Sequence, residues 1–264
     1  MERTYWLRQT TLLFPELEWS RPENKLQAGT LLIIGGNGYE FKAPANAYGD
    51  ALEAGIGVAT VLLPSSMQRV VSDIFPEAIF APSTPSGSFA RDTLALMLGL
   101  ASRADGTLLP GDIGRNSETT VLLERFLDEY RGHITLTKDA ADPFCQQPLA
   151  ILHRPNTLLV LAMGQLRRLG NTAHFPHAFT SEMELVQLVE TLHEFTKRFS
   201  LNIITHHQRH YVVAVNGQVS TTPDTSETSV WRATTSVAAS IWWLQNPTKP
   251  FEALTTAAYT VSSA

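Results

Sequence analysis

One stretch of the chain, residues 31–63, restricts the fold most, because it reads LLIIGGNGYEFKAPANAYGDALEAGIGVATVLL. Two apolar runs, 31–34 and 58–63, have the length and uninterrupted hydrophobicity of parallel strands that are covered on both faces. A glycine pair ends the first run, and the small-residue segment 45–54 suits a helix that approaches a sheet closely. The stretch therefore predicts a strand–helix–strand unit with a glycine-rich first turn.

Glycine turns of this kind are common sites for phosphate or sugar groups, and the alternative is a tight turn without a ligand. A second glycine turn, at 110–114, follows a short predicted strand at 107–109. Asn116 comes next and is expected to cap a helix over 117–130, because its side chain can accept an unpaired backbone N–H.

The rest of the chain alternates strand and helix patterns, which predicts an α/β fold with a mostly parallel sheet. Asn216-Gly217 predicts one antiparallel hairpin late in the chain. A TIM barrel is the alternative, but the regular strand–helix units are too few for it. The other expected strands are 78–81, 133–137, 157–162, 201–205 and 211–215, and the other expected helices start near 64, 92, 181, 234 and 250.

Two of these helices carry specific expectations. Ser181 to Glu184 reads as a capping box, followed by a core stripe of Leu185, Leu188, Val189, Leu192, Phe195 and Phe199. In the helix over 117–130, the side chains of Val121, Leu122 and Phe126 are expected to point inward.

Composition limits the class of protein. The 264 residues carry a net charge of −5 with 17% charged residues, which argues against nucleic-acid or membrane-surface partners. No apolar run reaches the ~18 residues of a membrane helix. Glu2 and Arg3 precede no long apolar region, so we expect no signal peptide and a cytoplasmic protein.

Domain organisation and cysteine usage follow from the same data. The length suits a single domain over 1–264, with 1–27 as an N-terminal extension that packs on the sheet or on another subunit. The single cysteine, Cys145, excludes an internal disulfide and fits a reducing compartment. No base lies beside it in the sequence, which favours a structural role over a nucleophile.

The stretch 31–63 also resembles a known family, through Gly35, Gly36, Asn37, Tyr39, Ala43, Pro44, Gly55 and Gly57. These residues are in register with V-I-G-G-S, a tyrosine, G-A-P and R-x-G-A-G of the ribokinase-like ADP/ATP-dependent NAD(P)H-hydrate dehydratases. Weaker matches follow in order at 110–115, at 136–141, which includes Asp139, and at 250–259. The resemblance implies a ribokinase-like three-layer α/β/α sandwich, with a mostly parallel sheet and a late antiparallel hairpin.

The same resemblance implies ligands. It implies ATP or ADP, with Mg²⁺, and a ligand derived from NAD(P)H. We also expect the chain to assemble as a homo-oligomer. The positions that match its substrate site are Gly36, Asn37, Tyr39, Ala43, Gly111 and Gly114. The positions that match its nucleotide site are His206, Arg209, His210 and Thr234.

The catalytic motifs of the family are not kept. Its T-P-H-P-G-E segment corresponds to 161–165, and its L-K-G lysine segment corresponds to 205–207. Its G-T-G-D turn, which supplies an anion hole and the aspartate base, corresponds to 232–235, so Thr235 occupies the aspartate position. Loss of a general base costs ~10²–10⁴-fold in rate. Asp224 and Glu227 lie upstream and are possible substitutes.

Histidines raise a separate question. His206, His207 and His210 cluster near a strand end, and His174 and His177 share a loop, so zinc binding is one interpretation. Neighbouring residues on a strand point to opposite faces, and no metal motif supports the clusters, so we expect no metal site.

Two functional hypotheses follow. The first is a divergent NAD(P)H-hydrate dehydratase-like enzyme of nicotinamide nucleotide repair, which would phosphorylate the hydroxyl of the hydrated nicotinamide ring and eliminate it. The second is a catalytically inactive relative that binds nucleotide or a partner. A small-sugar or vitamin kinase is a third interpretation, and it would need the same missing aspartate.

Overall fold

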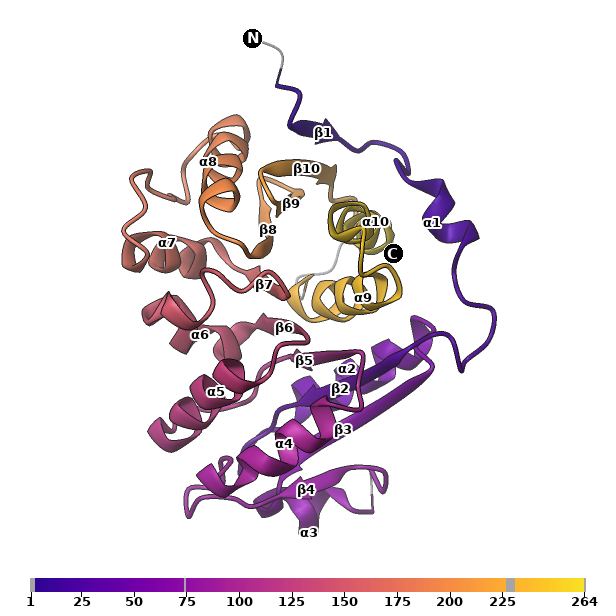
Figure 1. Cartoon of the computed structure of the whole chain (residues 1–264), viewed down its shortest axis with the longest axis vertical. Coiled ribbons are helices and arrows are strands. Elements are labelled where there is room, and N and C mark those ends of the chain that lie inside the picture. Colours follow the sequence, from indigo (N-terminus) through magenta and orange to yellow (C-terminus); the bar gives the residue numbers. More distant parts are fainter. Residues whose placement is uncertain (1–2, 74, 227–230, 264) are drawn as a thin grey trace.

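The computed structural model describes residues 3–73, 75–226 and 231–263, which form a ten-stranded sheet (Figure 1). The strand order is β1-β10-β9-β8-β7-β6-β5-β2-β3-β4. From β8 to β4 all neighbours are parallel, whereas β9 is antiparallel to both β8 and β10. The strands are β1 Trp6–Arg8, β2 Thr30–Ile34, β3 Val58–Pro64, β4 Ile79–Ala81, β5 Gly106–Leu109, β6 His133–Thr137, β7 Thr157–Leu161, β8 Asn202–His207, β9 His210–Val215 and β10 Gln218–Pro223.

Helices cover both faces of the sheet (Figure 1). Side chains of α4–α8 pack on one face, and side chains of α1, α2, α3, α9 and α10 pack on the other. The helices are α1 Pro15–Trp19, α2 Lys42–Glu53, α3 Gln68–Val71, α4 Leu94–Ala101, α5 Ser117–Glu129, α6 Lys138–Gln146, α7 Met163–Thr172, α8 Leu185–Arg198, α9 Trp231–Gln245 and α10 Pro250–Ser262. The predicted three-layer α/β/α sandwich with a mostly parallel sheet is confirmed.

Strand β2 shows why its sequence is apolar throughout. Leu32 and Ile34 belong to the core on the α4–α8 face, and Leu31 and Ile33 belong to the core on the opposite face. Because side chains alternate along a strand, a sheet that is covered on both faces needs apolar residues at every position.

The late part of the sheet contains two hairpins. The predicted turn at Asn216 (φ 48°) and Gly217 (φ 80°) joins β9 to β10 and is confirmed. A second left-handed turn, at Gln208 (φ 47°) and Arg209 (φ 55°), joins β8 to β9. The sequence did not indicate it, because neither residue is one of the glycine, asparagine or aspartate residues that favour such turns.

The first residues of the chain pack on the edge of the sheet. Strand β1 pairs in parallel with β10, and the indole Nε1 of Trp6 donates to Thr221 Oγ1 (3.0 Å). The side chain of Leu17, on α1, is buried against the core that α10 also contacts. Within the described ranges, no helix is both long enough and apolar enough to cross a membrane.

Some local predictions were wrong. Helix α8 begins at Leu185 rather than after Ser181, and Gln187 Oε1 accepts the N–H of Glu184 (3.0 Å). The reason is a long-range contact, since His207 Nε2 donates to Met183 O (2.6 Å) and holds that segment out of the helix. Val121 was expected to point inward and is 36% exposed. The helices α6 and α7 were not predicted.

Candidate functional site

The two predicted glycine turns lie against each other at the carboxyl ends of β2 and β5. A Cβ atom added to Gly35 would lie 2.7 Å from Gly111 O, so this approach requires a residue without a side chain. Gly36 (φ 90°) and Gly111 (φ 118°) both have the positive φ that glycine tolerates best. In open α/β sheets ligands bind at the carboxyl ends of the strands, so this edge is the candidate site.

Asp112 ties the second glycine turn to the first. Asn37, which is 8% exposed, donates from Nδ2 to Asp112 O (2.8 Å). The Asp112 carboxylate accepts the backbone N–H of Ala43 (2.6 Å) in the first turn of α2. A carboxylate at a helix N-terminus satisfies a free donor and the helix dipole, so Asp112 acts as an internal anion at the start of α2.

The first turn of α6, directly after β6, joins this arrangement. Asp139 Oδ2 accepts the N–H of Gly114 (2.9 Å), and the preceding residue Lys138 has a positive φ of 50°. A positive φ in a residue with a side chain is unusual and is often found at functional sites. Four of the predicted substrate positions, Asn37, Ala43, Gly111 and Gly114, are thus brought together around Asp112 and Asp139.

A cavity of about 550 Å³ opens beside these loops. Tyr39 lies on its rim with 88% of its surface exposed, and Lys42, Asp112, Lys138 and Ala233 contribute to its lining. The sequence placed Tyr39 in a substrate site, and its exposed ring is available to a ligand in this cavity.

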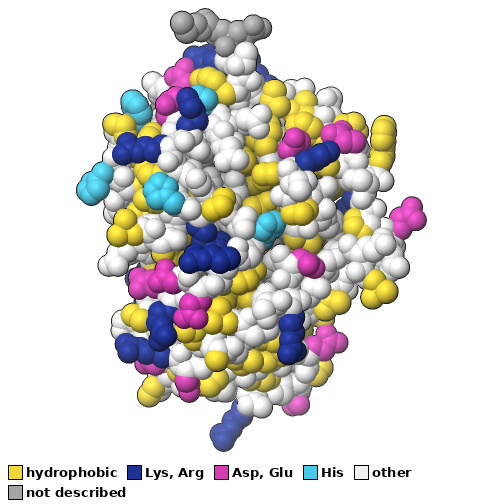
Figure 2. Space-filling view, in the orientation of Figure 1, with side chains coloured by type: hydrophobic (Ala, Val, Ile, Leu, Met, Phe, Trp, Pro, Cys, Tyr) yellow, Lys and Arg dark blue, Asp and Glu magenta, His cyan; other side chains and the backbone are white. Residues whose placement is uncertain are grey.

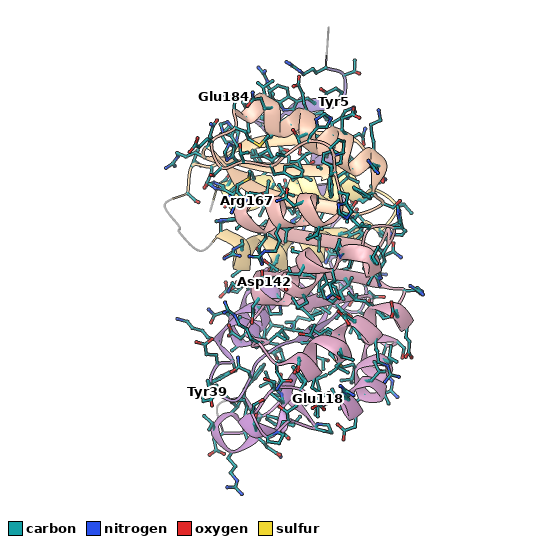
Figure 3. The ribbon with its side chains drawn as sticks, turned by 90° about the vertical axis from the view of Figure 1, so that its left-hand side faces the viewer. Tyr5, Tyr39, Glu118, Asp142, Arg167 and Glu184 are labelled. Carbon is teal, nitrogen blue, oxygen red and sulfur yellow. The ribbon has the colours of Figure 1, made fainter. Side chains whose placement is uncertain are left out.

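A second groove of about 460 Å³ continues from Lys138 toward α7 and α9. Its lining includes Lys138, Arg167, Arg168 and Arg232 as well as Asp139 and Asp142. Tyr39, Asp142 and Arg167 follow one another along the long axis of the molecule (Figure 3). The space-filling view shows dark blue and magenta side chains gathered near the middle of one face (Figure 2).

Hydrogen bonds connect the side chains of this groove. Arg232 Nη1 donates to Gln165 Oε1 (3.1 Å), and Gln165 Nε2 donates to Lys138 O (2.7 Å) and to Asp142 Oδ1 (2.8 Å). Burial lowers the pKa of the Arg232 guanidinium, and the carboxylates of Asp142 and Asp139 oppose that effect. Arg232 therefore brings a partly desolvated positive charge to the first turn of α9.

The adjacent positions of α9 differ in exposure. Thr234 is exposed, whereas Thr235, which the sequence resemblance predicted at the position of the family aspartate, is fully buried. The Thr235 hydroxyl is buried against the side chain of Tyr211. Thr235 therefore offers neither a carboxylate nor an accessible oxygen to a ligand.

His206 and Asp224 form a pair beside α9. His206 Nε2 lies 2.9 Å from Asp224 Oδ2, and Asp224 Oδ1 accepts the backbone N–H (3.0 Å) and the hydroxyl (2.6 Å) of Ser226. Arg209 Nη2 donates to Asp224 O (3.0 Å). The ring centroid of Trp231 lies 5.5 Å from that of His206.

Protonation states follow from this geometry. Burial lowers the pKa of His206, although the contact with Asp224 opposes it. Burial raises the pKa of Asp224, but the Ser226 and His206 hydrogen bonds outweigh it, so the net shift is downward. At neutral pH the imidazole is neutral and the carboxylate is ionised, so Nε2–H donates to Asp224 and Nδ1 is left as an acceptor.

Stability should depend on pH through two histidines, His206 and His133. His206 and His133 both have lowered pKa values in the folded protein, mainly through burial. The unfolded chain therefore binds protons first as the pH falls below about 6.5. We expect the free energy of unfolding to be highest above that pH and to decrease as the pH approaches the folded-state pKa values.

Urea unfolding at several pH values between 7.5 and 5 measures this dependence. His206→Gln keeps a hydrogen-bond donor for Asp224 but removes one titrating group. It should therefore reduce the change in the free energy of unfolding with pH, and His133 should account for the change that is left. The exposed His174, changed to glutamine, is the matched control and should leave the pH dependence unchanged. A stability that is constant or rising as the pH falls through this interval would contradict the assigned states.

Other predicted positions are accounted for individually. His210 Nδ1 lies 2.7 Å from Gln208 O within its own turn, so it does not join His206. Glu227 lies outside the described residues. Cys145 is buried, and burial raises the pKa of its thiol to about 12, which agrees with a structural role. No group of three or more His, Cys, Asp or Glu side chains in the described ranges suits a metal ion.

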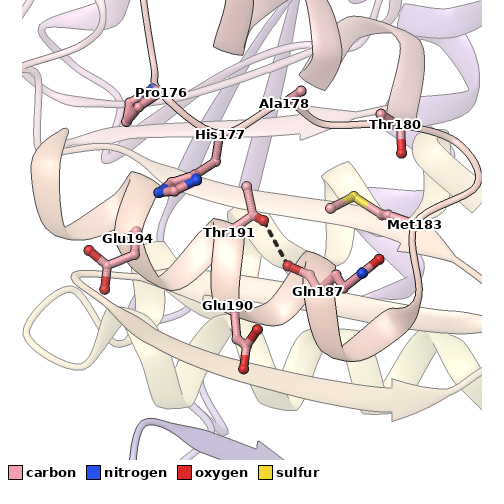
Figure 4. Close-up of a pocket in the computed structure, with 9 residues that line it drawn as sticks. All are labelled: Pro176, His177, Ala178, Thr180, Met183, Gln187, Glu190, Thr191 and Glu194. Atoms are coloured by element: carbon pink, nitrogen blue, oxygen red, sulfur yellow. Dashed lines mark hydrogen bonds between the residues drawn. The ribbon is translucent and has the colours of Figure 1, made fainter.

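A separate cavity of about 480 Å³ lies along α8 and the segment that precedes it (Figure 4). Thr191 Oγ1 donates to Gln187 O (2.7 Å) within it, and His177 and Glu194 line it. Glu190, on the same side, already forms an ion pair with Arg3 (2.6 Å). We assign no function to this cavity.

Sequence reasoning missed several residues of the site. Asp112 and Lys138 were not singled out, although each follows closely on the end of a predicted strand, which was the available signal. Gln165 and Asp142 carried no local signal, because their importance comes from contacts with Lys138 and Arg232.

Known proteins resemble this chain in sequence and in structure. No protein-family model matches the chain. The chain is 31% identical over 106 residues to the bifunctional NAD(P)H-hydrate repair enzyme Nnr of Methanothermobacter thermautotrophicus. The match covers 40% of this chain and only 20% of that enzyme, so the chain spans about a fifth of its curated relative.

Solved structures resemble the whole chain. A ribokinase-like superfamily protein from Enterococcus faecalis superposes with a TM-score of 0.74 at 17% identity, covering 100% of this chain and 88% of that one. The ADP/ATP-dependent NAD(P)H-hydrate dehydratase of Bacillus subtilis, co-crystallised with ATP and Mg²⁺ and soaked with CoA, has a TM-score of 0.64 at 14% identity, covering 94% and 86%.

The chain therefore has the ribokinase-like fold. Its sequence is in addition similar to a NAD(P)H-hydrate repair enzyme, which confirms the resemblance that its glycine turns indicated.

Proposed function

We propose that the chain is a ribokinase-like nucleotide-binding protein that binds ATP or ADP at the carboxyl edge of the sheet, without the phosphorylation step of the dehydratases. The observation that carries this proposal is the first turn of α9. Thr235 is fully buried and has no carboxylate, and Arg232 brings a guanidinium to the groove instead.

The groove suits the phosphates of a nucleotide. Lys138, Arg167, Arg168 and Arg232 supply positive charge, and arginine in particular binds phosphate oxygens in a bidentate manner. Asp139 and Asp142 line the same groove and offer the oxygen ligands that a Mg²⁺ ion carried by the nucleotide prefers. The cavity beside Tyr39 is the place for a ligand derived from NAD(P)H.

The carboxylates near the site are already engaged. Asp112 accepts the N–H of Ala43, and Asp139 accepts the N–H of Gly114. Asp224 accepts hydrogen bonds from Ser226 and faces His206, and its pKa is lowered. A carboxylate with a lowered pKa is a weak base, so Asp224 is poorly suited to abstract a proton from a substrate hydroxyl. One oxygen of Asp112 and one of Asp139 are held by the backbone N–H groups that they accept, so neither carboxylate is turned toward a substrate hydroxyl as a base.

The His206–Asp224 pair supports a second candidate function, a divergent dehydratase. A carboxylate that holds a neutral imidazole leaves the other ring nitrogen free to accept a proton, as in Ser-His-Asp triads. Under this alternative His206 Nδ1 is the base, and His206→Gln would lower turnover of hydrated NADPH by about 10²–10⁴-fold. Absence of turnover in the unaltered protein would exclude it.

Thermal unfolding tests the nucleotide proposal. Saturation with ATP or ADP, in the presence of Mg²⁺, should raise the free energy of unfolding by about 2.7 kcal/mol at a hundredfold excess over Kd. Arg232→Gln should weaken binding by about tenfold, because one charged phosphate contact is lost. The exposed Arg103, changed to glutamine, is the matched control. No stabilisation by ATP, ADP or NADPH would contradict the proposal.

Assembly and location belong to the same proposal. We propose a homo-oligomer, supported by two large apolar side chains near the N-terminus, Trp19 and Leu26, which are 84% and 90% exposed. We also propose a cytoplasmic location, supported by the single buried cysteine, which fits a reducing compartment. Light scattering of the purified chain would measure its mass, and a monomer at all concentrations would contradict the proposed assembly.

A further inference from the structure

The opposite edge of the sheet carries a positively charged cavity of about 390 Å³. It is lined by Arg131, Leu149, Ala150, His153, Arg154, Pro155 and Asn156. These residues precede β6 and β7, whereas the candidate nucleotide site follows the ends of the same strands. This position separates the cavity from the nucleotide site. Its lining contains two arginines and a histidine but no carboxylate, so it suits an anion and not a cation.

Arg154 forms the base of this cavity and is only 5% exposed. Its Nη1 donates to Asn156 O and to Thr157 Oγ1 (both 2.9 Å). Its Nη2 donates to Tyr130 O (2.8 Å) and to Gly132 O (2.7 Å). A guanidinium has five N–H donors, and the fifth, on Nε, has no partner among the described residues.

The positive charge of Arg154 also lacks a counter-ion. All four acceptors are neutral, and within the described part of the chain no ion pair involves Arg154 or Arg131. Burial lowers the pKa of Arg154 to about 10; Tyr130 opposes this, and the Arg131 guanidinium adds to it. Arg154 remains protonated at neutral pH, and a buried charge without an opposite charge is costly.

A structural role explains part of this arrangement. Tyr130 follows the last residue of α5, and the carboxyl end of a helix favours a cation. Arg154 also joins the segments that lead into β6 and β7. This role does not account for Arg131 and His153, which are exposed beside the same cavity: Arg131 adds positive charge to it, and His153 adds a ring that can donate a hydrogen bond.

We propose that this cavity is a binding site for a phosphate group, held by Arg131 and His153 above the buried positive charge of Arg154. A tetrahedral oxyanion can accept hydrogen bonds from several donors at once and would supply the missing negative charge. Asn156 Nδ2 donates to Arg131 O (3.0 Å), which fixes the backbone of that residue at the cavity. The phosphate can be inorganic or part of a phosphate monoester, since both present the same oxygens.

A titration followed by ¹H–¹⁵N NMR of arginine Nε–H groups tests the proposal. Adding inorganic phosphate, or glycerol 3-phosphate in a parallel series, should shift the Arg154 Nε–H resonance in a saturable manner. The series with the tighter binding identifies the source of the phosphate. Arg131→Gln should weaken binding by about tenfold, as expected for loss of one charged contact. Arg103→Gln, at the same edge of the sheet but outside the cavity lining, should leave it unchanged.

Several results would overturn the proposal. One is an Arg154 Nε–H resonance that does not move at any phosphate concentration. Another is a shift that Arg131→Gln and Arg103→Gln change equally. Both substitutions are made at exposed positions and keep the buried Arg154, so neither variant should fail to fold. Arg232→Gln should leave this phosphate binding intact while weakening ATP binding. The phosphate proposal and the nucleotide proposal are therefore tested independently.

Discussion

Replacing Gly111 by valine is expected to lower the free energy of unfolding by about 3 kcal/mol or more and to abolish nucleotide binding. Gly111 has a φ of 118°, which a β-branched residue does not tolerate. An added Cβ would lie 2.9 Å from Asp139 Oδ1 and 3.0 Å from Lys138 Cδ. The substitution therefore strains the backbone and displaces two residues of the proposed site.

Urea unfolding and ATP titration of the variant measure both effects. Gly49→Ala is the matched control, because an added Cβ at this position of α2 meets nothing within 4 Å. Alanine favours a helix over glycine by up to about 1 kcal/mol, so the control should be as stable as the unaltered protein or more so. A Gly111→Val protein with unchanged stability would show that the glycine turns do not pack as described.

Phe195→Ala should be similarly damaging, at about 3–5 kcal/mol of unfolding free energy. Phe195 lies on α8, is fully buried, and its ring centroid is 4.8 Å from that of Phe199 and 5.0 Å from that of Phe175. Removal of the ring leaves a cavity that its aromatic neighbours Phe175, Phe179 and Phe199 cannot fill without strain.

Calorimetric or urea-induced unfolding checks this expectation. Val121→Ala is the control, since Val121 is 36% exposed on α5 and should change stability by no more than about 0.5 kcal/mol. Equal effects of the two substitutions would mean that α8 does not belong to the central core.

The features of the fold that the sequence revealed are those coded locally. The strand β2 and its glycine turn depend on consecutive residues, and the α8 stripe depends on a helical period within one segment. We predicted the start of α8 too early in the chain. The reason is that His207, 24 residues after Met183, donates a hydrogen bond to the Met183 carbonyl. A contact between residues so far apart leaves no trace in local periodicity.

The candidate site shows the same division. The glycines were identified, because only glycine suits such turns. The contact of Asp112 with Ala43 spans 69 residues, and that of Arg232 with Gln165 spans 67, so neither follows from the sequence. His206 and Asp224 were given separate roles as nucleotide ligand and possible base, and the structure joins them in one pair.

The most direct test of the central claim, nucleotide binding without phosphoryl transfer, is ³¹P NMR of the protein mixed with ATP, Mg²⁺ and hydrated NADPH. We expect the ATP resonances to shift or broaden on binding, and no ADP to accumulate beyond the protein-free sample. ATP resonances that match free ATP would contradict the binding. Steady accumulation of ADP that depends on hydrated NADPH would contradict the absence of chemistry and favour His206 as the base.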